Sequence, residues 1–110
     1  MIYPCKQVKY FPITDYLYYM TNFNISFNFR EVEYTAHVHK VPFVNNFPVQ
    51  FQVNNIQPVI PDVPDPYIFI HEPKKEIFEF ADYNGSLELP EKILSALKKY
   101  CKENEISLTT

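Results

Sequence analysis

The sequence predicts an α+β protein in which an antiparallel sheet of about five to seven strands packs against one C-terminal helix. Three observations lead to this prediction. Several short segments alternate apolar and polar residues with a period of two, which is typical of half-buried strands. Asn84-Gly85 is a strong signal for a hairpin turn. Residues 90–104 then repeat apolar residues at helical spacing.

The first clear strand signal lies in residues 23–29, where the odd positions are apolar and the even positions polar. In residues 32–38 the apolar positions are even, so the chain must absorb one residue between Phe29 and Glu31. We expect a β-bulge there rather than a tight turn, because no Gly, Asn-Gly or Pro is present. Residues 14–20 fit a short helix and a strand almost equally well.

The next alternating segment, residues 49–53, forms a hairpin with the preceding strand if the turn lies at Asn45-Asn46. Such a turn matches polar residues with polar ones and apolar residues with apolar ones. The register would place His37 opposite Asn54, Val38 opposite Val53, and His39 opposite Gln52.

Residues 57–66 are rich in proline and predict an extended strap across the sheet that buries Val59, Ile60 and Val63. Further strands are expected at 67–71, at 76–83 and, after the Asn84-Gly85 turn, at 86–89.

The C-terminal helix has clear start and stop signals. Pro90 suits its first turn, and Asn104 suits its end. The tail of residues 105–110 is expected to fray. One apolar stripe should face the sheet, formed by Ile93, Leu94, Leu97, Tyr100 and Cys101.

Composition limits the function classes. A chain of 110 residues predicts a single domain over residues 1–110. One glycine excludes a P-loop or a dinucleotide-binding fingerprint, and one arginine with a net charge of −3 argues against nucleic acid. The sequence contains no apolar run long enough for a signal peptide or a membrane span, so we expect a cytoplasmic protein of a cell or an infected host. Cys5 and Cys101 are interpreted as reduced thiols, with a bridge between the termini as the minor alternative.

His37 and His39 project to the same face of a strand, as some pairs of metal ligands do. Only His71, on a separate hairpin, could complete a three-ligand site. The other interpretation is that both histidines continue the polar row of Glu31, Glu33 and Thr35. We expect His71 to lie out of reach, and we predict no cofactor.

A second alternative concerns DNA. Residues 86–100 followed by 105–110 resemble the strand, the first helix and the start of the second helix of ribbon–helix–helix DNA-binding proteins. This resemblance implies a nucleic-acid-binding regulator. Independently of it, the basic pairs Lys74-Lys75 and Lys98-Lys99 are the residues through which nucleic-acid binding would act. Glu88 stands where the family places base-reading residues.

The remaining feature is the aromatic content of ten phenylalanines and nine tyrosines. We expect a non-enzymatic accessory protein that binds another protein, or itself as an oligomer, through a sheet edge and an aromatic patch. The alternative is that the rings fill a thick core. Residues encoded by AT-rich codons favour a virus or a mobile element as the source, with an inhibitor or structural role. The predicted contact residues are Tyr16, Tyr18, Tyr19, Phe43, Phe47 and Tyr67.

Overall fold

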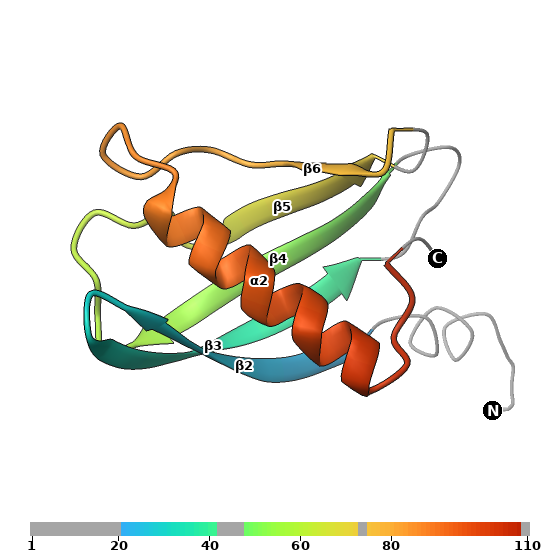
Figure 1. Cartoon of the computed structure of the whole chain (residues 1–110), viewed down its shortest axis with the longest axis horizontal. Coiled ribbons are helices and arrows are strands. Elements are labelled where there is room, and N and C mark those ends of the chain that lie inside the picture. The colour runs from blue at the N-terminus through green and yellow to red at the C-terminus, as the bar shows by residue number, and fades with distance from the viewer. Residues whose placement is uncertain (1–20, 42–47, 73–74, 109–110) are drawn as a thin grey trace, which may run out of the picture.

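The computed structural model describes residues 21–41, 48–72 and 75–108. These residues form a five-stranded antiparallel sheet in which each strand pairs with the next along the chain, in the order β2-β3-β4-β5-β6. Helix α2 crosses one face of this sheet (Figure 1). The α+β prediction is therefore confirmed. The elements are β2 (Thr21–Phe29), β3 (Val32–Val41), β4 (Val49–Gln57), β5 (Tyr67–Glu72), β6 (Ile77–Glu79) and α2 (Glu88–Glu103).

Strands β2 and β3 are joined by a two-residue turn at Arg30 and Glu31, whose φ angles are 51° and 68°. Phe29 faces Val32 across this turn. The predicted bulge is therefore wrong at this position, and the tight turn is what reverses the apolar phase. Positive φ at both central residues gives the twist that a two-residue hairpin requires, although neither residue is Gly or Asn.

The register predicted for β3 and β4 is confirmed, with His37 opposite Asn54, Val38 opposite Val53 and His39 opposite Gln52. The Asn45-Asn46 turn itself lies outside the described residues, as do residues 14–20. The register shifts between Thr35 and His37, where Asn55 of β4 has a φ of 55°. A bulge is thus present, but it lies in β4.

The strap between β4 and β5 buries Ile60 and packs Val63 against the core, whereas Val59 is 73% exposed. The prediction for Val59 is therefore wrong. The hydroxyl of Tyr83 donates a 2.6 Å hydrogen bond to the Pro61 carbonyl oxygen and so ties the strap to the turn that precedes α2. That turn is formed by Asn84 and Gly85, with φ angles of 53° and 75°.

In place of the return strand predicted after Asn84-Gly85, the structure has a single bridge between Tyr83 and Ser86. The strand predicted at 86–89 is wrong because helix α2 already begins at Glu88, before Pro90. Strand β6 is likewise much shorter than the predicted 76–83.

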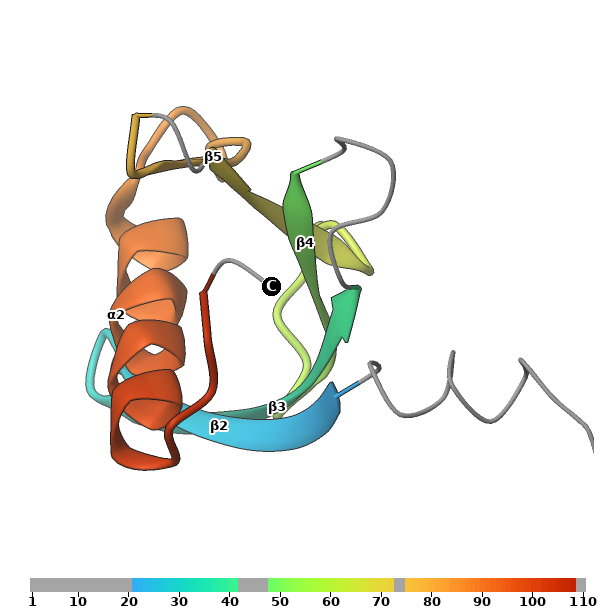
Figure 2. The same cartoon turned by 90° about the vertical axis from the view of Figure 1, so that its right-hand side faces the viewer.

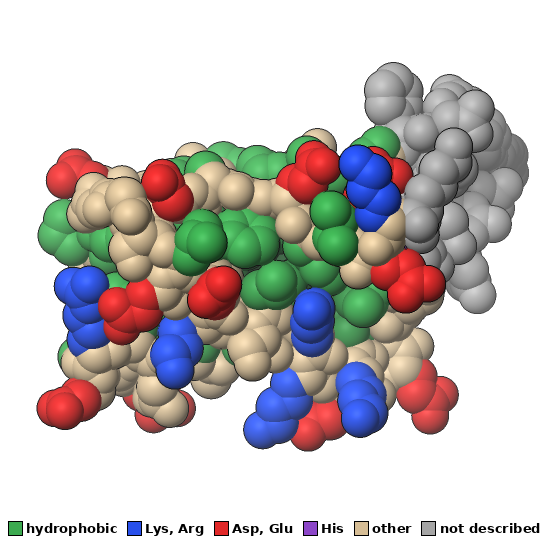
Figure 3. Space-filling model, turned by 45° about the horizontal axis from the view of Figure 1, so that its top comes forward, with side chains coloured by type: hydrophobic (Ala, Val, Ile, Leu, Met, Phe, Trp, Pro, Cys, Tyr) green, Lys and Arg blue, Asp and Glu red, His purple; other side chains and the backbone are tan. Residues whose placement is uncertain are grey.

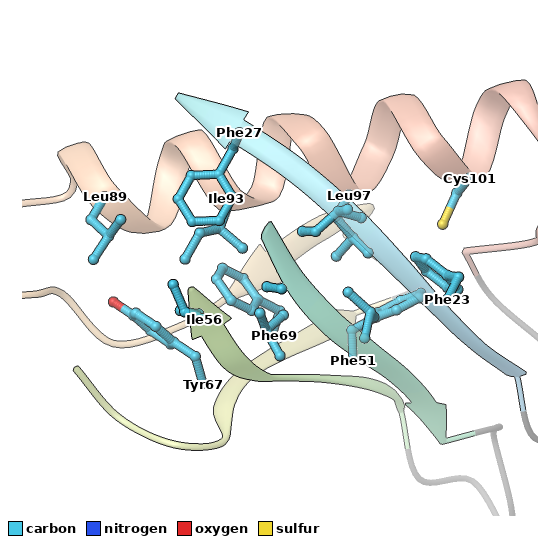
Figure 4. Close-up of a cluster of buried hydrophobic side chains, with 14 of the residues drawn as sticks. Phe23, Phe27, Phe51, Ile56, Tyr67, Phe69, Leu89, Ile93, Leu97 and Cys101 are labelled. Carbon is cyan, nitrogen blue, oxygen red and sulfur yellow. The ribbon is translucent and has the colours of Figure 1, made fainter. Parts of the chain in front are cut away.

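Helix α2 buries Ile93, Leu97 and Cys101 of the predicted stripe against the inner face of the sheet, whereas Leu94 and Tyr100 are only partly buried. Leu89, Ile93, Leu97 and Cys101 point toward aromatic side chains from the strands (Figure 4). Asn104 ends the helix, and its backbone N–H donates to the Tyr100 carbonyl oxygen. The other members of this core include Phe23, Phe27, Phe51, Tyr67 and Phe69.

The segment after α2 turns back between the helix and the sheet (Figure 2). Ile106 donates its N–H to the Cys101 carbonyl oxygen at 2.8 Å, and Ile106 and Leu108 pack against the core. Residues 105–108 are therefore not frayed, because their apolar side chains close one end of the core.

Candidate functional site

The two edge strands of the sheet differ in length and in charge. Strand β6 is three residues long, follows Glu76 and ends in Glu79. Strand β2 is nine residues long and contains no charged residue and no proline. Edge strands usually carry charges, prolines or bulges that prevent pairing with another chain. Among the described residues, no strand pairs with the outer side of β2.

The β2–β3 register determines which backbone groups β2 presents at this edge. Phe29 faces Val32 across a two-residue turn, and the residues that flank such a turn form a hydrogen-bonded pair. Because bonded positions alternate along an antiparallel strand, the odd residues of β2 bond to β3. The N–H and C=O groups of Asn22, Asn24, Ser26 and Asn28 therefore point away from β3, toward the free edge.

A groove of about 310 Å³ runs between this edge and helix α2, and we call it the edge groove. Its strand side is formed by Asn24, Ile25 and Ser26. Its helix side is formed by Ala96, Lys99, Tyr100 and Glu103. The Tyr100 ring is held in place by stacking on Phe23, with 4.4 Å between ring centroids and 3° between ring planes.

The sheet face away from α2, which we call the open face, carries a row of uncharged polar groups. The Asn22 Oδ1 atom lies 3.1 Å from His37 Nε2 and 2.7 Å from His39 Nδ1. The Asn24 Oδ1 atom lies 3.2 Å from His37 Nδ1. A hollow of about 330 Å³ on this face is lined by Asn24, Ser26, Thr35, His37, Asn55 and Gln57 among others.

The edge groove and the open-face hollow lie on opposite sides of β2, and both include residues 24–26. An added strand would direct alternate side chains toward each of them. This geometry is the one that binding by strand addition requires, with backbone hydrogen bonds for affinity and alternating pockets for specificity.

The predicted metal ligands do not converge. His71 pairs with Val49, a core residue, and is itself buried on the inner face. His37 and His39 lie on the open face, in contact with asparagine side chains. His71 therefore lies out of reach of His37 and His39, as expected, and the parts of the chain that the structure describes contain no group of three metal-binding side chains.

Among the predicted contact residues, only Tyr67 lies in the described part of the chain. It is 1% exposed, and its hydroxyl donates a 2.6 Å hydrogen bond to the Ala81 carbonyl oxygen. Burial, together with the nearby Asp82 carboxylate, raises the pKa of Tyr67 to about 12. Tyr67 thus belongs to the core and not to a contact patch. Tyr16, Tyr18, Tyr19, Phe43 and Phe47 lie outside the described residues.

One end of the core holds a lysine beside a thiol. Lys40 is 5% exposed, and burial lowers the pKa of its ammonium group, while the nearby Cys101 thiolate opposes that change. Burial also raises the pKa of the Cys101 thiol, and Lys40 opposes it. A buried thiol with a raised pKa is a poor nucleophile.

The ribbon–helix–helix resemblance does not extend to the structure. Residue 86 forms a single bridge and not a strand, the apolar stripe of α2 is buried against the sheet, and residues 105–108 do not start a second helix.

Within the described residues, the lysines proposed as nucleic-acid contacts do not form a basic surface on their own. Lys98 lies with its Nζ atom 5.5 Å from the centre of the Phe78 ring. On the face shown in Figure 3, basic and acidic side chains are interspersed around a hydrophobic band, which does not favour a phosphate backbone. Lys74 lies outside the described residues.

No helix in the described ranges is long and apolar enough to cross a membrane. Comparison of the chain with protein-family models, with curated proteins and with solved structures finds no match in any of the three.

Proposed function

We propose that this chain is a non-enzymatic interaction protein that binds an extended protein segment at the free edge of β2. The observation that supports the proposal best is the outer edge of β2, which has nine residues without a charge or a proline and pairs with no other strand in the part of the chain that the structure describes. Such an edge is a template for strand addition. We place the protein in the cytoplasm of a cell or an infected host, as an accessory factor of a virus or a mobile element.

The bound segment would gain two kinds of contact. Its backbone would bond to the outward N–H and C=O groups of Asn24 and Ser26. Its alternate side chains would enter the edge groove and the open-face hollow. One set would therefore meet Tyr100 and Ala96, and the other set would meet uncharged polar groups such as His37. A segment with alternating apolar and uncharged polar residues fits both sides.

Selection from a displayed library of random extended nonapeptides tests this proposal. Wild-type protein should enrich alternating peptides, and Ser26→Pro should not bind them. Proline removes the outward N–H at this position but leaves the hydrogen bonds between β2 and β3 intact, because the Ser26 N–H does not take part in them. Ser26→Ala retains the N–H and is the matched control. Circular dichroism and thermal melting of all three proteins show whether each is folded.

Enriched peptides that bind wild-type protein and Ser26→Ala at least about tenfold more tightly than Ser26→Pro, which corresponds to roughly 1.4 kcal/mol, support the proposal. Peptides that bind folded Ser26→Pro as tightly as wild-type protein would contradict the proposed strand addition. A selection that enriches no peptide would contradict it as well.

A further inference from the structure

We infer that the segment that occupies the β2 edge is strand β2 of a second copy of this chain, so that the protein is a two-fold symmetric dimer with one continuous sheet. The inference rests on the proposed function and names its partner. It follows from the sequence of β2, from the position of the edge groove and from two charges on α2.

Strand β2 matches its own edge because two copies continue both sheet faces, while the inward side chains of each copy stay under their own α2 and α2 of the second copy covers the edge groove. Its inward side chains are Phe23, Ile25, Phe27 and Phe29, all of them buried under α2. Its open-face side chains are Asn22, Asn24, Ser26 and Asn28, all of them exposed. In an antiparallel pair of two such strands, each sheet face continues with the same chemistry, and no charge meets a like charge at the edge.

The edge groove fixes the register. Its strand side is centred on Ile25, so a two-fold axis through the groove passes beside this residue. Ile25 then faces Ile25 of the second copy. Asn24 faces Ser26 of the second copy, and these two residues exchange hydrogen bonds through groups that already point outward.

The same axis makes the two α2 helices antiparallel on the same side of the joined sheet. The residue order is therefore reversed across the axis. Lys99 and Glu103 both line the edge groove. In the register that we infer, Lys99 of one copy faces Glu103 of the other, and the pair occurs twice because the contact is symmetric. This self-complementary charge arrangement favours a second copy over an unrelated strand.

Analytical ultracentrifugation over a range of protein concentrations provides the first test. We expect wild-type protein and Ser26→Ala to sediment as dimers at micromolar concentration. We expect Ser26→Pro to remain folded and monomeric. A wild-type protein that stays monomeric throughout the range overturns the inference.

Charge exchange provides the second test. In a homodimer, Lys99→Glu sets a carboxylate against a carboxylate at both charge pairs, and Glu103→Lys sets an ammonium group against an ammonium group. Each variant should therefore dimerise at least about tenfold more weakly than wild-type protein. A mixture of the two variants should form a heterodimer that is tighter than either homodimer, because a carboxylate then faces an ammonium group at both charge pairs. Lys98→Glu, with its side chain beside Phe78, is the matched control and should leave the dimer intact.

The outcomes separate the inference from the proposed function. A monomeric wild-type protein that still selects peptides in a Ser26-dependent manner has an edge that binds other chains, and only the second copy is ruled out. A dimer that is unaffected by Ser26→Pro and by charge exchange uses another surface, and it removes the inferred β2 pairing. A mixture of Lys99→Glu and Glu103→Lys that fails to associate overturns the proposed register.

Discussion

The Lys40 ammonium group donates a 2.6 Å hydrogen bond to the carbonyl oxygen of Ser107, sixty-seven residues further along the chain. Lys40 lies on the inner face of β3, where Val38 and Ala36 are also buried. The contact therefore joins the end of the sheet to the segment that closes the core after α2. It also places a group that prefers water in an apolar environment, so its charge affects stability.

Replacing Lys40 by methionine should make stability less dependent on pH. Burial depresses the pKa of Lys40 in the folded protein. The folded state therefore favours the neutral amine. The stabilisation from this shift is complete above the unfolded pKa of Lys40, about 10.4, and it is lost as the pH falls through the lowered folded pKa.

We therefore expect Lys40→Met to be more stable than wild-type protein at pH 6, by about 1 kcal/mol. The advantage should shrink as the pH rises toward about 10.4. Urea unfolding at several pH values measures this difference. A difference that stays constant over the whole range would contradict the prediction.

Tyr67 should make the protein sensitive to alkali. Its pKa is raised to about 12, from 10.0. The stability that the protonated Tyr67 hydroxyl contributes is therefore complete below the pKa of tyrosine in the unfolded chain. It is lost as the pH rises through the pKa of Tyr67 in the folded protein, because the unfolded tyrosine ionises first.

At pH 7, Tyr67→Phe should cost about 1 kcal/mol through loss of the hydrogen bond to Ala81. Between about pH 10 and 12 this cost should diminish, because the variant has no hydroxyl to ionise. Chemical denaturation at pH 7, 10 and 11 measures the two effects. Equal costs at all three values would show that Tyr67 ionises normally.

His71 is a buried side chain whose Nδ1 atom has no hydrogen-bond partner in the described structure. Its ring packs against Phe78, with 4.9 Å between ring centroids. Leucine at this position should raise the free energy of unfolding by about 1–2 kcal/mol, because it removes an unpaired polar atom from the core. His37→Leu, on the open face, serves as the control and should give no such gain. A His71→Leu variant that melts below wild-type protein would sink this prediction.

The Arg30-Glu31 turn should be improved by glycine. Glu31 has a φ of 68°, which costs an L-residue about 1–2 kcal/mol, whereas glycine adopts it freely. Glycine also adds entropy to the unfolded chain, so we expect a net gain of about 0.5–1 kcal/mol for Glu31→Gly. Glu33→Gly, inside strand β3, should destabilise by a similar amount. Thermal melting of the two variants compares them directly. Melting temperatures that change in the same direction in both variants would contradict the strain attributed to Glu31.

Local patterns predict those elements in which one face is apolar and the other polar. The α2 stripe and the β3–β4 register follow from such alternation, since a slip by one residue would bury His37 or expose Val38. The Asn84-Gly85 turn is predictable because both residues adopt positive φ easily. The Arg30-Glu31 turn is not, since neither residue type signals positive φ. It occurs beside two contacts of Arg30, an exposed ion pair with Glu88 at 3.2 Å and a stack on the Phe29 ring at 4.8 Å.

The candidate site is only partly predictable. The sequence of residues 21–29 already lacks charge and proline, but its place at the edge depends on the order of the strands. The orientation of His71 does not follow from the sequence, because Tyr67, Ile68, Phe69 and Ile70 before it are all large and show no alternation. Composition points to a sheet edge as the contact surface, but the helix side of the groove requires the packing of Tyr100 on Phe23.

The brevity of β6 also bears on how far this sheet can grow. A chain with two adhesive edges can stack without limit into a fibre, because every added copy exposes a fresh edge. Here the far edge is three residues long, follows Glu76 and ends in Glu79, and these carboxylates repel a second such edge. In the dimer that we infer, pairing at β2 would use up the long edge of both copies at once and leave the short β6 edges at the two ends. The joined sheet would then stop growing at two copies and would not continue into an amyloid-like fibre.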